Sequence, residues 1–402
     1  MKKIFGIVFL FMIIFSANTQ WVQIPNGIGP NSFIGGLASI GNNIFASTWD
    51  TAFVPGSVYI STNSGNSWTI KLTLINDYDI NCLASIGNNV IAGADRNLWI
   101  STNNGANWFV TLPNQDVLGL DVVGTSIFAG TYWSGSEQVY RSDNNGLNWT
   151  SCGLNKVGYC FTKLGINVFA GTSENGVYIS SNNGNSWTQT SLINKHVHAI
   201  AALDGKVFAG TDTGMYVSSN NGSSWSITSI NSGYVFSIII SNNNILASVP
   251  QKGIYLSTNN GVNWILKNEG LPSSLGTLKM MESNGNLFLG TYGNSVYKRP
   301  SSQVFGINQI STEIPGSFNL YQNYPNPFNP ATKIRFDVPK SGNVEISVYD
   351  MLGRKVTSLV DQKLRSGTFE TEWNASDYPS GVYYYKLTTD GVSETKKMVL
   401  LK

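Results

Sequence analysis

The sequence predicts an all-β protein in which a seven-bladed β-propeller precedes a small immunoglobulin-like β-sandwich. Three observations lead to this prediction. The phrase Ser-x-Asn-x-Gly-x-x-Trp occurs six times, at intervals of about 40 residues. A second phrase, of which Val207-Phe-Ala-Gly-Thr211 is one copy, occurs seven times. After about residue 312 both phrases stop and charged residues become denser. A repeat of this length indicates one four-stranded unit arranged around an axis.

Each repeat contains four short runs that are rich in β-branched and aromatic residues and separated by Gly or Asn turns. In the second repeat the first run is Cys82–Ile86, the second is Val90–Ala94 and the third is Leu98–Ile100. The fourth run carries the Trp of the first phrase, as residues 66–70 do in the first repeat. We therefore expect each unit to form one four-stranded sheet.

The seventh unit lacks its fourth run, because it stops after Tyr297-Lys-Arg-Pro300. The segment Gln20–Ile24 resembles the missing run, including its Trp. We expect Trp21–Ile24 to pair beside Tyr297 and close the ring, since an open ring would leave an unpaired sheet edge.

The first residues have the pattern of a secretory signal peptide. Lys2 and Lys3 precede an apolar run from Ile4 to Phe15, which is too short to span a bilayer. Cleavage is expected between residues 17 and 20. We predict four segments: a signal peptide over 1–19, the propeller over 20–300, a linker over 301–317 and the C-terminal sandwich over 318–402.

Charge and cysteine content restrict the function classes. A formal net charge of +2 favours neither a nucleic-acid partner nor an anionic membrane. Cys152 and Cys160 flank one loop and could form a disulfide in an exported protein. However, Cys82 and Cys160 share a repeat position at which other units have small residues such as Ala199. Small buried side chains are the alternative interpretation of these cysteines.

The first phrase resembles the Asp-box, or BNR repeat, found in propellers of sialidases, xyloglucanases and related proteins, and the resemblance covers residues 21–300. The acidic position of that family is Asn in every copy here. Asn can still accept backbone N–H bonds in a tight turn, but it lacks the charge that a hard metal ion prefers. We expect Ser to cap the turn, Gly to adopt the strained backbone angle and Trp to pack between blades. The structural Asp-box residues are Ser61, Asn63, Gly65, Trp68, Ser101, Asn103, Gly105, Trp108, Ser142, Asn144, Gly146, Trp149, Ser180, Asn182, Gly184, Trp187, Ser218, Asn220, Gly222, Trp225, Ser257, Asn259, Gly261 and Trp264.

From Phe318 onward, short alternating strands predict a β-sandwich. Its motifs resemble the type A C-terminal sorting domain of type IX secretion. The resemblance implies that the type IX secretion machinery is a partner and that the protein crosses an outer membrane, to be released or attached at the surface. The sorting-motif residues are Pro325, Asn326, Pro327, Phe328, Tyr349, Asp350, Gly353, Arg354, Gly381, Tyr383, Tyr385, Lys396 and Lys397.

One face of the propeller is expected to hold the Asp-box turns, and the other to hold the loops after Ala-Gly-Thr and the loops between blades. Aromatic side chains beside carboxylates in these loops suit sugar rings, which stack on aromatic faces and offer hydroxyls for hydrogen bonds. Ordinary loop residues are the alternative interpretation. The ligand-binding candidates are Trp49, Asp50, Tyr78, Tyr132, Trp133 and Tyr292.

The signals for catalysis are weak. The catalytic candidates are Asp50 and Asp212, of which Asp212 lies in a segment that faintly resembles one bearing a catalytic aspartate in xyloglucanases. Those enzymes use two facing propellers, and one is predicted here. Sialidases need an arginine cluster for the substrate carboxylate, which three scattered arginines do not supply. His196 and His198 could share a strand face, but no third metal ligand accompanies them.

The sequence thus predicts a secreted or cell-surface propeller that is exported by type IX secretion and acts as a non-catalytic glycan- or protein-binding module. A glycoside hydrolase of the sialidase or xyloglucanase type is the alternative, and an assembly or scaffold factor is the second alternative. No metal, cofactor, nucleic-acid partner or transmembrane segment of the mature chain is expected. The ligand and the oligomeric state stay open.

Overall fold

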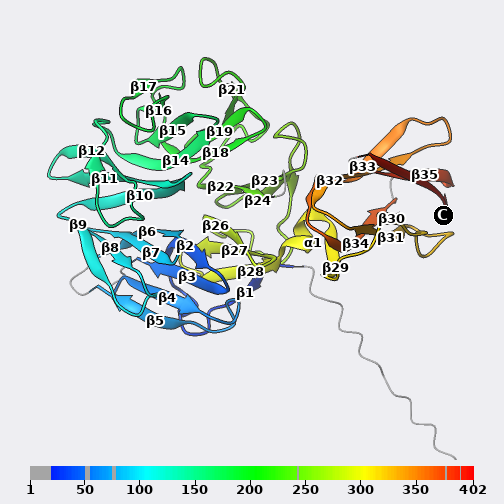
Figure 1. Ribbon diagram of the computed structural model, residues 1–402, viewed down its shortest axis with the longest axis horizontal. Helices are drawn as coiled ribbons and strands as arrows, with labels where there is room; N and C mark the ends of the chain where they lie inside the picture. The colour runs from blue at the N-terminus through cyan, green and yellow to red at the C-terminus, as the bar shows by residue number, and fades with distance from the viewer. Residues whose placement is uncertain (1–19, 50–54, 75–77, 242–243, 376–377, 390) are drawn as a thin grey trace, which may run out of the picture.

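The computed structural model describes residues 20–49, 55–74, 78–241, 244–375, 378–389 and 391–402. A ring of β-sheets is followed by a smaller unit of two sheets at the C-terminal end (Figure 1). In the described part of the chain one short helix, α1 (Ser301–Phe305), lies between them. The predicted all-β class is confirmed. Asp50 and the predicted signal peptide lie outside the described residues.

Seven four-stranded antiparallel sheets lie between Val22 and Pro300 in the described part. The first contains β2 (Ile34–Ile40), β3 (Asn43–Thr48), β4 (Ser57–Ser61) and β5 (Thr69–Thr73). The second contains β6 (Ile80–Ile86), β7 (Asn89–Ala94), β8 (Asn97–Ser101) and β9 (Phe109–Pro113). The third contains β10 (Asp116–Val123), β11 (Ser126–Trp133), β12 (Ser136–Ser142) and β13 (Thr150–Ser151).

The next three sheets repeat this order. The fourth contains β14 (Gly158–Leu164), β15 (Asn167–Thr172), β16 (Gly176–Ser180) and β17 (Thr188–Gln189). The fifth contains β18 (Val197–Leu203), β19 (Lys206–Thr211), β20 (Gly214–Ser218) and β21 (Ser226–Ile227). The sixth contains β22 (Ser237–Ser241), β23 (Asn244–Val249), β24 (Gly253–Ser257) and β25 (Ile265–Leu266).

The seventh sheet closes the ring. It contains β26 (Thr277–Ser283), β27 (Asn286–Thr291), β28 (Val296–Pro300) and, from the other end of the propeller, β1 (Val22–Gln23). Val22 pairs with Lys298 and Gln23 pairs with Tyr297. The predicted pairing of the first strand beside Tyr297 is therefore confirmed. Trp21 is 2% exposed, and its Nε1 donates to the carbonyl of Lys267 at 2.8 Å.

The innermost strands contact one another in the cyclic order β2, β6, β10, β14, β18, β22, β26 and back to β2. The second strand of each sheet carries the Phe-Ala-Gly-Thr phrase and is buried on both faces, as in β19. Such a strand lies between two neighbouring sheets and has no solvent face. This explains why apolar and small residues follow one another in the phrase and do not alternate with exposed polar residues.

Aromatic packing joins each sheet to the one before it. Trp187 of the fourth sheet meets Phe128 of the third at a ring-centroid distance of 6.2 Å. Trp68 of the first sheet lies in one cluster with Phe288 of the seventh, and Trp264 lies in one cluster with Phe208. Because the Phe of the Phe-Ala-Gly-Thr phrase packs against the Trp of the next sheet, the two repeated phrases fit each other.

The six Ser-x-Asn-x-Gly-x-x-Trp turns share one hydrogen-bond pattern. In the turn after β16, the Ser180 hydroxyl accepts the backbone N–H of Gly184 at 2.8 Å. The Asn182 side-chain oxygen accepts the N–H of Ser186 at 2.9 Å, and the same two bonds recur at 2.8–2.9 Å in the other five turns. Gly184 has a φ of +83°, and a Cβ there would lie 2.6 Å from the Phe128 ring. The turn thus uses an uncharged acceptor and has no room for a side chain at the Gly position.

The C-terminal unit is a sandwich of two four-stranded sheets. One sheet contains β29 (Ile307–Ser311), β34 (Gly367–Asn374), β31 (Ala331–Val338) and β30 (Asn319–Leu320). The other contains β33 (Lys355–Leu364), β32 (Gly342–Tyr349), β35 (Gly381–Thr389) and β36 (Val392–Leu400). Phe336, Ile346 and Leu387 are among the fully buried residues of their common core.

The segment 301–317, expected to be a linker, is structured in its first part. Val304 of α1 is 1% exposed and packs in the same cluster as Trp21 and Tyr297. Ile307 of β29 is buried in the core of the sandwich, and β29 pairs with β34. The segment therefore belongs to both units, because it supplies an apolar residue to each core.

The three cysteines are free and buried in separate clusters of the propeller. Burial raises the pKa of the Cys152 thiol to about 11. The interpretation as small buried side chains therefore agrees with the structure, and the Cys152–Cys160 disulfide does not form in it. Among the residues that the structure describes, no helix is long and apolar enough to cross a membrane.

Candidate functional site

The two faces of the propeller are built differently. The turn face holds residues 62–68, their five equivalents and the short turns between first and second strands. Neighbouring sheets are linked there by amide groups: Asn89 Nδ2 donates to the Asn145 carbonyl and Asn284 Nδ2 to that of Gly41, both at 3.0 Å. The loop-rich face holds the loops after each second strand and the connections between sheets, such as residues 190–196, 228–236 and 292–295.

Two of the predicted ligand-binding residues meet on the loop-rich face, where the seventh and first sheets adjoin. Phe33, Trp49 and Tyr292 form an aromatic trio. The ring centroids of Phe33 and Tyr292 lie 4.4 Å apart and those of Trp49 and Tyr292 lie 5.9 Å apart. Tyr292 is 54% exposed, whereas Trp49 Nε1 is buried and has no hydrogen-bond partner in the described ranges. Phe33, which precedes β2, was not among the predicted residues.

The other predicted residues lie elsewhere. Tyr78 precedes β6, and the Arg96 guanidinium lies 5.1 Å from its ring centroid. Tyr132 and Trp133 end β11, and no ring contact joins them to the aromatic trio in the described part of the chain. The segment expected to be a long loop there is an extended hairpin, because Trp133 pairs with Ser136. Two residues, Ser134 and Gly135, suffice for the turn, and both have positive φ.

Asp212 lies in a polar hollow on the loop-rich face, formed by the fourth, fifth and sixth sheets. The hollow has a volume of about 330 Å³ and is lined by Glu174, Asn194, His196, His198, Asp212 and Tyr234. We call it the histidine hollow. Glu174 follows β15, Asp212 follows β19 and Tyr234 precedes β22, so the ring geometry, and not the local sequence, brings them together.

The two imidazoles stack, as their alternation along one strand allows. Their centroids lie 4.2 Å apart with an interplanar angle of 19°. Tyr159 lies 4.7 Å from the His196 ring and Phe236 lies 4.6 Å from the His198 ring, again between centroids. The Nε2 atoms of both histidines and the Oδ1 atom of Asp212 are buried, and none of them has a hydrogen-bond partner among the residues that the structure describes.

Burial keeps both imidazoles neutral at pH 7. Burial, together with the neighbouring His196 and Lys279, lowers the pKa of His198 to about 3. Burial also lowers the pKa of His196, although the charges of Asp212 and Glu174 act in the opposite direction. Within the described ranges, no three His, Cys, Asp or Glu side chains are placed to hold a metal ion.

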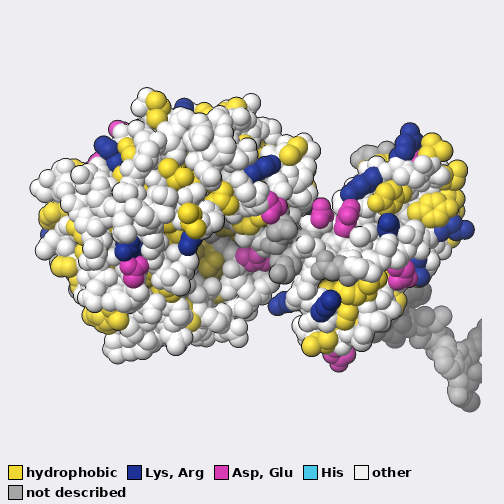
Figure 2. Space-filling model, turned by 45° about the horizontal axis from the view of Figure 1, so that its top comes forward, with side chains coloured by type: hydrophobic (Ala, Val, Ile, Leu, Met, Phe, Trp, Pro, Cys, Tyr) yellow, Lys and Arg dark blue, Asp and Glu magenta, His cyan; other side chains and the backbone are white. Residues whose placement is uncertain are grey.

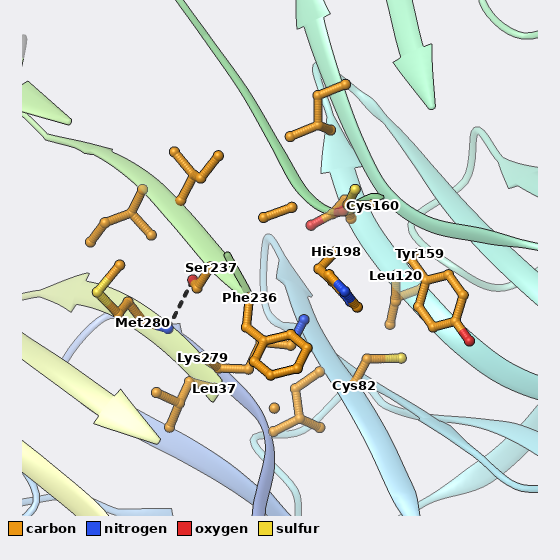
Figure 3. A pocket seen from close by; sticks show the side chains of 17 residues that line it. Leu37, Cys82, Leu120, Tyr159, Cys160, His198, Phe236, Ser237, Lys279 and Met280 are labelled. Atoms are coloured by element: carbon orange, nitrogen blue, oxygen red, sulfur yellow. Dashed lines mark hydrogen bonds between the residues drawn. The ribbon is translucent and has the colours of Figure 1, made fainter. Parts of the chain in front are cut away.

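Beneath the hollow, the innermost strands enclose a cavity of about 180 Å³ on the propeller axis. Figure 3 shows His198, Phe236 and Tyr159 on its wall, together with Lys279 and the cysteines Cys82 and Cys160. Asp121 also lines it, and the backbone N–H of Phe161 donates to its Oδ2 at 2.7 Å. Burial raises the pKa of the Asp121 carboxyl to about 6, although that hydrogen bond and Lys279 act against the rise.

The sorting-motif residues form two groups in the sandwich. Asp350 Oδ1 accepts the backbone N–H groups of Leu352 and Arg354, and Arg354 Nε donates to Asp350 Oδ2 at 2.8 Å. At the chain end, Asn326 Oδ1 accepts the Val399 N–H, and the buried Phe328 donates its own N–H to the Val399 carbonyl, both at 2.9 Å. The Pro-Asn-Pro-Phe segment is thereby attached to β36, the strand that carries Lys396 and Lys397.

Charge distribution separates the two units. On the side seen in Figure 2 the propeller surface is mainly uncharged and polar, whereas Lys, Arg, Asp and Glu are closer together on the sandwich.

Sequence reasoning singled out Asp212 and the two histidines, but it missed Asn194, Tyr234 and Phe33. The signal that could have found these residues is that all three lie in the connections between sheets, which differ in length from one sheet to the next.

Comparison with known proteins agrees with this architecture. The family described as secretion system C-terminal sorting domain matches residues 322–401, and the DUF6242 β-propeller domain matches residues 152–286. No curated protein sequence matches the chain.

Solved structures resemble the fold. PorZ, described as an essential bacterial surface component of the type IX secretion system of Porphyromonas gingivalis, is 15% identical with a TM-score of 0.57. That match covers 93% of this chain, which spans only 60% of the PorZ structure. YCF48 bound to a D1 peptide is 14% identical with a TM-score of 0.55, covering 70% of this chain and 94% of that structure. YCF48 from Cyanidioschyzon merolae is 13% identical with a TM-score of 0.52, covering 70% and 98%.

At these identities the likeness concerns the fold, whereas the matched C-terminal family concerns export. The chain is thus a β-propeller protein with a C-terminal sorting domain that directs it through type IX secretion to the cell surface or the extracellular space.

Proposed function

We propose that the exported propeller is a non-catalytic binding module that holds a glycan or a protein on its loop-rich face. The sorting domain delivers it, and the propeller binds. The observation that carries this proposal is the aromatic trio of Phe33, Trp49 and Tyr292. The half-exposed Tyr292 ring extends a surface of three packed rings, and aromatic rings of this kind stack on sugars or on apolar side chains.

The trio has a rigid support. The indole nitrogen of Trp49 would lie 2.7 Å from a Cβ added at Gly35, so the indole lies close against the backbone of β2. Tyr292 stands edge-on to both neighbouring rings, with interplanar angles of 83° and 76°. A preformed aromatic surface loses little conformational entropy when a ligand binds.

One structural neighbour supports a binding role for this fold, and another supports a location at the cell surface. PorZ is described as a surface component of a secretion system, and one YCF48 structure is described with a D1 peptide bound. For this chain we take from them the class of role, an extracellular propeller that binds another molecule, and not the identity of the ligand.

The experiment compares two pairs of aromatic residues on the same face. Wild type, Trp49→Ala/Tyr292→Ala and Tyr132→Ala/Trp133→Ala are screened on a glycan array. For a protein ligand, a photo-crosslinking residue at position 292 or 132 is tested on intact cells. We expect glycan binding, or a cross-linked species, that depends on positions 49 and 292 and not on 132 and 133. Absence of both signals, or equal dependence on the two pairs, would contradict the proposal.

A glycoside hydrolase is the second candidate, because Glu174 and Asp212 line one hollow. Two carboxyl groups that flank a sugar are the requirement of that chemistry, one of them with a raised pKa. Among the described carboxyl groups, that of Asp121 has a raised pKa, and Asp121 lies in the central cavity below the histidine hollow. Hydrolysis predicts release of sugar from polysaccharides that disappears in Asp212→Asn. Release that persists in this variant, or no release by wild type, would exclude it.

A further inference from the structure

We propose that the histidine hollow is a second binding site and that it holds the side chain of a lysine or arginine from a peptide ligand. It lies across the ring from the aromatic trio and shares no residue with it. Its test therefore does not depend on the proposed function.

The hollow presents two carboxylates to its ligand, those of Glu174 and Asp212. Asp212 Oδ1 is buried and no described residue donates to it, and an unmatched buried acceptor of this kind is unfavourable unless a ligand satisfies it. Glu174 lines the same hollow and its side chain is exposed at the rim. A lysine ammonium has three N–H donors, an arginine guanidinium has five, and neither has an acceptor. A basic side chain can therefore donate to both carboxylates without adding an acceptor.

Aromatic rings complete the site. Tyr234 is 54% exposed, and its ring lies 5.8 Å from that of His198, between centroids. Phe236 and Tyr159 flank the two stacked imidazoles. Aromatic faces attract cations, most strongly where water is partly excluded. The volume of about 330 Å³ admits one side chain and not a folded surface.

The charges that surround the hollow leave its two carboxylates available. The imidazoles are neutral, so they do not compensate Glu174 or Asp212. Lys195 donates to Thr213 Oγ1 at 3.0 Å and lies over the Tyr216 ring, while Lys279 lies in the central cavity. In the described part of the chain neither lysine comes within 4 Å of a carboxylate oxygen of these two residues.

Binding in the hollow can be observed directly by NMR, because the chain has two histidines and both line the hollow. NMR of the imidazole protons follows the mature protein, produced without a histidine tag, during titration with three blocked tripeptides: Gly-Lys-Gly, Gly-Arg-Gly and Gly-Gln-Gly. We expect the Lys or Arg peptide to shift both imidazole signals with a Kd in the millimolar range or tighter. The Gln peptide has the same backbone and should not shift them.

Three carboxylate-to-amide variants separate the site from the rest of the protein. Asp212→Asn and Glu174→Gln should each weaken binding of the Lys or Arg peptide by about tenfold, which is the loss of affinity expected for one charge-assisted hydrogen bond. Asp204→Asn removes a carboxylate on the turn face and should bind like wild type. If Asp212→Asn does not fold, the exposed Glu174→Gln carries the test. The proposal is overturned by equal shifts with the Gln peptide, by no shift with any peptide, or by unchanged binding in the folded variants.

Discussion

The turn face and the loop-rich face of the propeller are made from the same seven sheets, yet they differ in almost every respect. On the turn face six turns repeat one pattern, in which the Ser hydroxyl accepts the Gly N–H and the Asn side-chain oxygen accepts the N–H of the residue before the Trp. On the loop-rich face the connections differ from sheet to sheet. Buried side-chain atoms that have no described hydrogen-bond partner occur on this second face, at the histidine hollow and at the aromatic trio.

The difference indicates a division of labour. Repeated hydrogen bonds and Trp–Phe contacts stabilise the ring wherever they recur, so their residues cannot vary independently. The loops after the second strands are free of this constraint, and residues from three sheets can meet there, as Glu174, Asp212 and Tyr234 do. Substitutions on the turn face should therefore affect stability, whereas substitutions on the loop-rich face should affect binding.

The largest stability effect is expected at the junction of the ring. Trp21→Ala should lower the free energy of unfolding by about 3–5 kcal/mol, the usual cost of removing a fully buried large aromatic residue. Urea unfolding measures the change. Trp133→Ala, on the half-buried loop-rich hairpin, is the matched control and should cost clearly less. Equal losses in the two variants would remove the distinction between the junction and the loops.

Glycines of the turn face should separate crowding from backbone strain. Gly184 and Gly165 both have positive φ, +83° and +61°, but a Cβ at Gly165 meets nothing within 4 Å. Both changes to Ala carry a backbone cost, and Gly184→Ala adds a clash with Phe128. We expect Gly184→Ala to be the less stable variant by about 2 kcal/mol. Thermal or urea unfolding measures both, and equal stability would mean that the Trp–Phe contact between sheets is not closely packed.

The histidine hollow should respond to acid. Because the folded-state pKa of His198 is depressed to about 3 from an ordinary 6.5, the unfolded chain binds more protons below pH 6.5. The stability contribution of neutral His198 is thus present above pH 6.5 and is lost as the pH falls toward about 3. Asp121, whose pKa is raised from 3.8 to about 6, acts oppositely, because its contribution is lost as the pH rises through about 6.

NMR titration isolates the histidines from Asp121. The His198 signal of the folded protein should stay in the neutral form down to about pH 5, and the His196 midpoint should lie below the ordinary value, whereas in urea both should titrate near it. A midpoint near the ordinary value in the folded protein would show that the imidazoles are solvated, and the hollow would then be less closed than described.

The smallest effect is expected for the Asn that replaces the acidic residue of the Asp-box. Asn182 Oδ1 accepts from Ser186 N–H, and its Nδ2 donates to the Ser186 hydroxyl at 2.9 Å. In Asn182→Asp the carboxylate keeps the acceptor and the hydroxyl can turn to donate. The change should stay within about 0.5 kcal/mol, against about 1 kcal/mol for Asn182→Ala, which loses the acceptor. An equal loss in both would mean that the turn needs the amide donor.

Much of the ring could be predicted because its information is local and repeated. The missing fourth run of the last unit, together with Trp21 near the start, is enough to predict the pairing with Tyr297. The candidate site could not be predicted to the same degree. Asn194 and Tyr234 belong to connections without a motif, and they meet Asp212 only because the sheets are arranged in a ring. Trp133 belongs to the third sheet, whereas the trio lies where the seventh and first sheets adjoin, and the two-residue turn that extends β11 and β12 is a detail that the Ser-Gly pair indicates but does not fix.

Closure of the ring by the first strand can be measured directly by hydrogen–deuterium exchange of the mature protein. Trp21 N–H donates to the Glu269 carbonyl at 2.7 Å, and Ile24 N–H donates to the Val296 carbonyl at 2.8 Å. If β1 completes the seventh sheet, the peptide that spans these amides should exchange as slowly as the peptide that contains β28. Rapid exchange in the first peptide, with β28 still protected, would contradict the closed ring and the assignment of the two faces that follows from it.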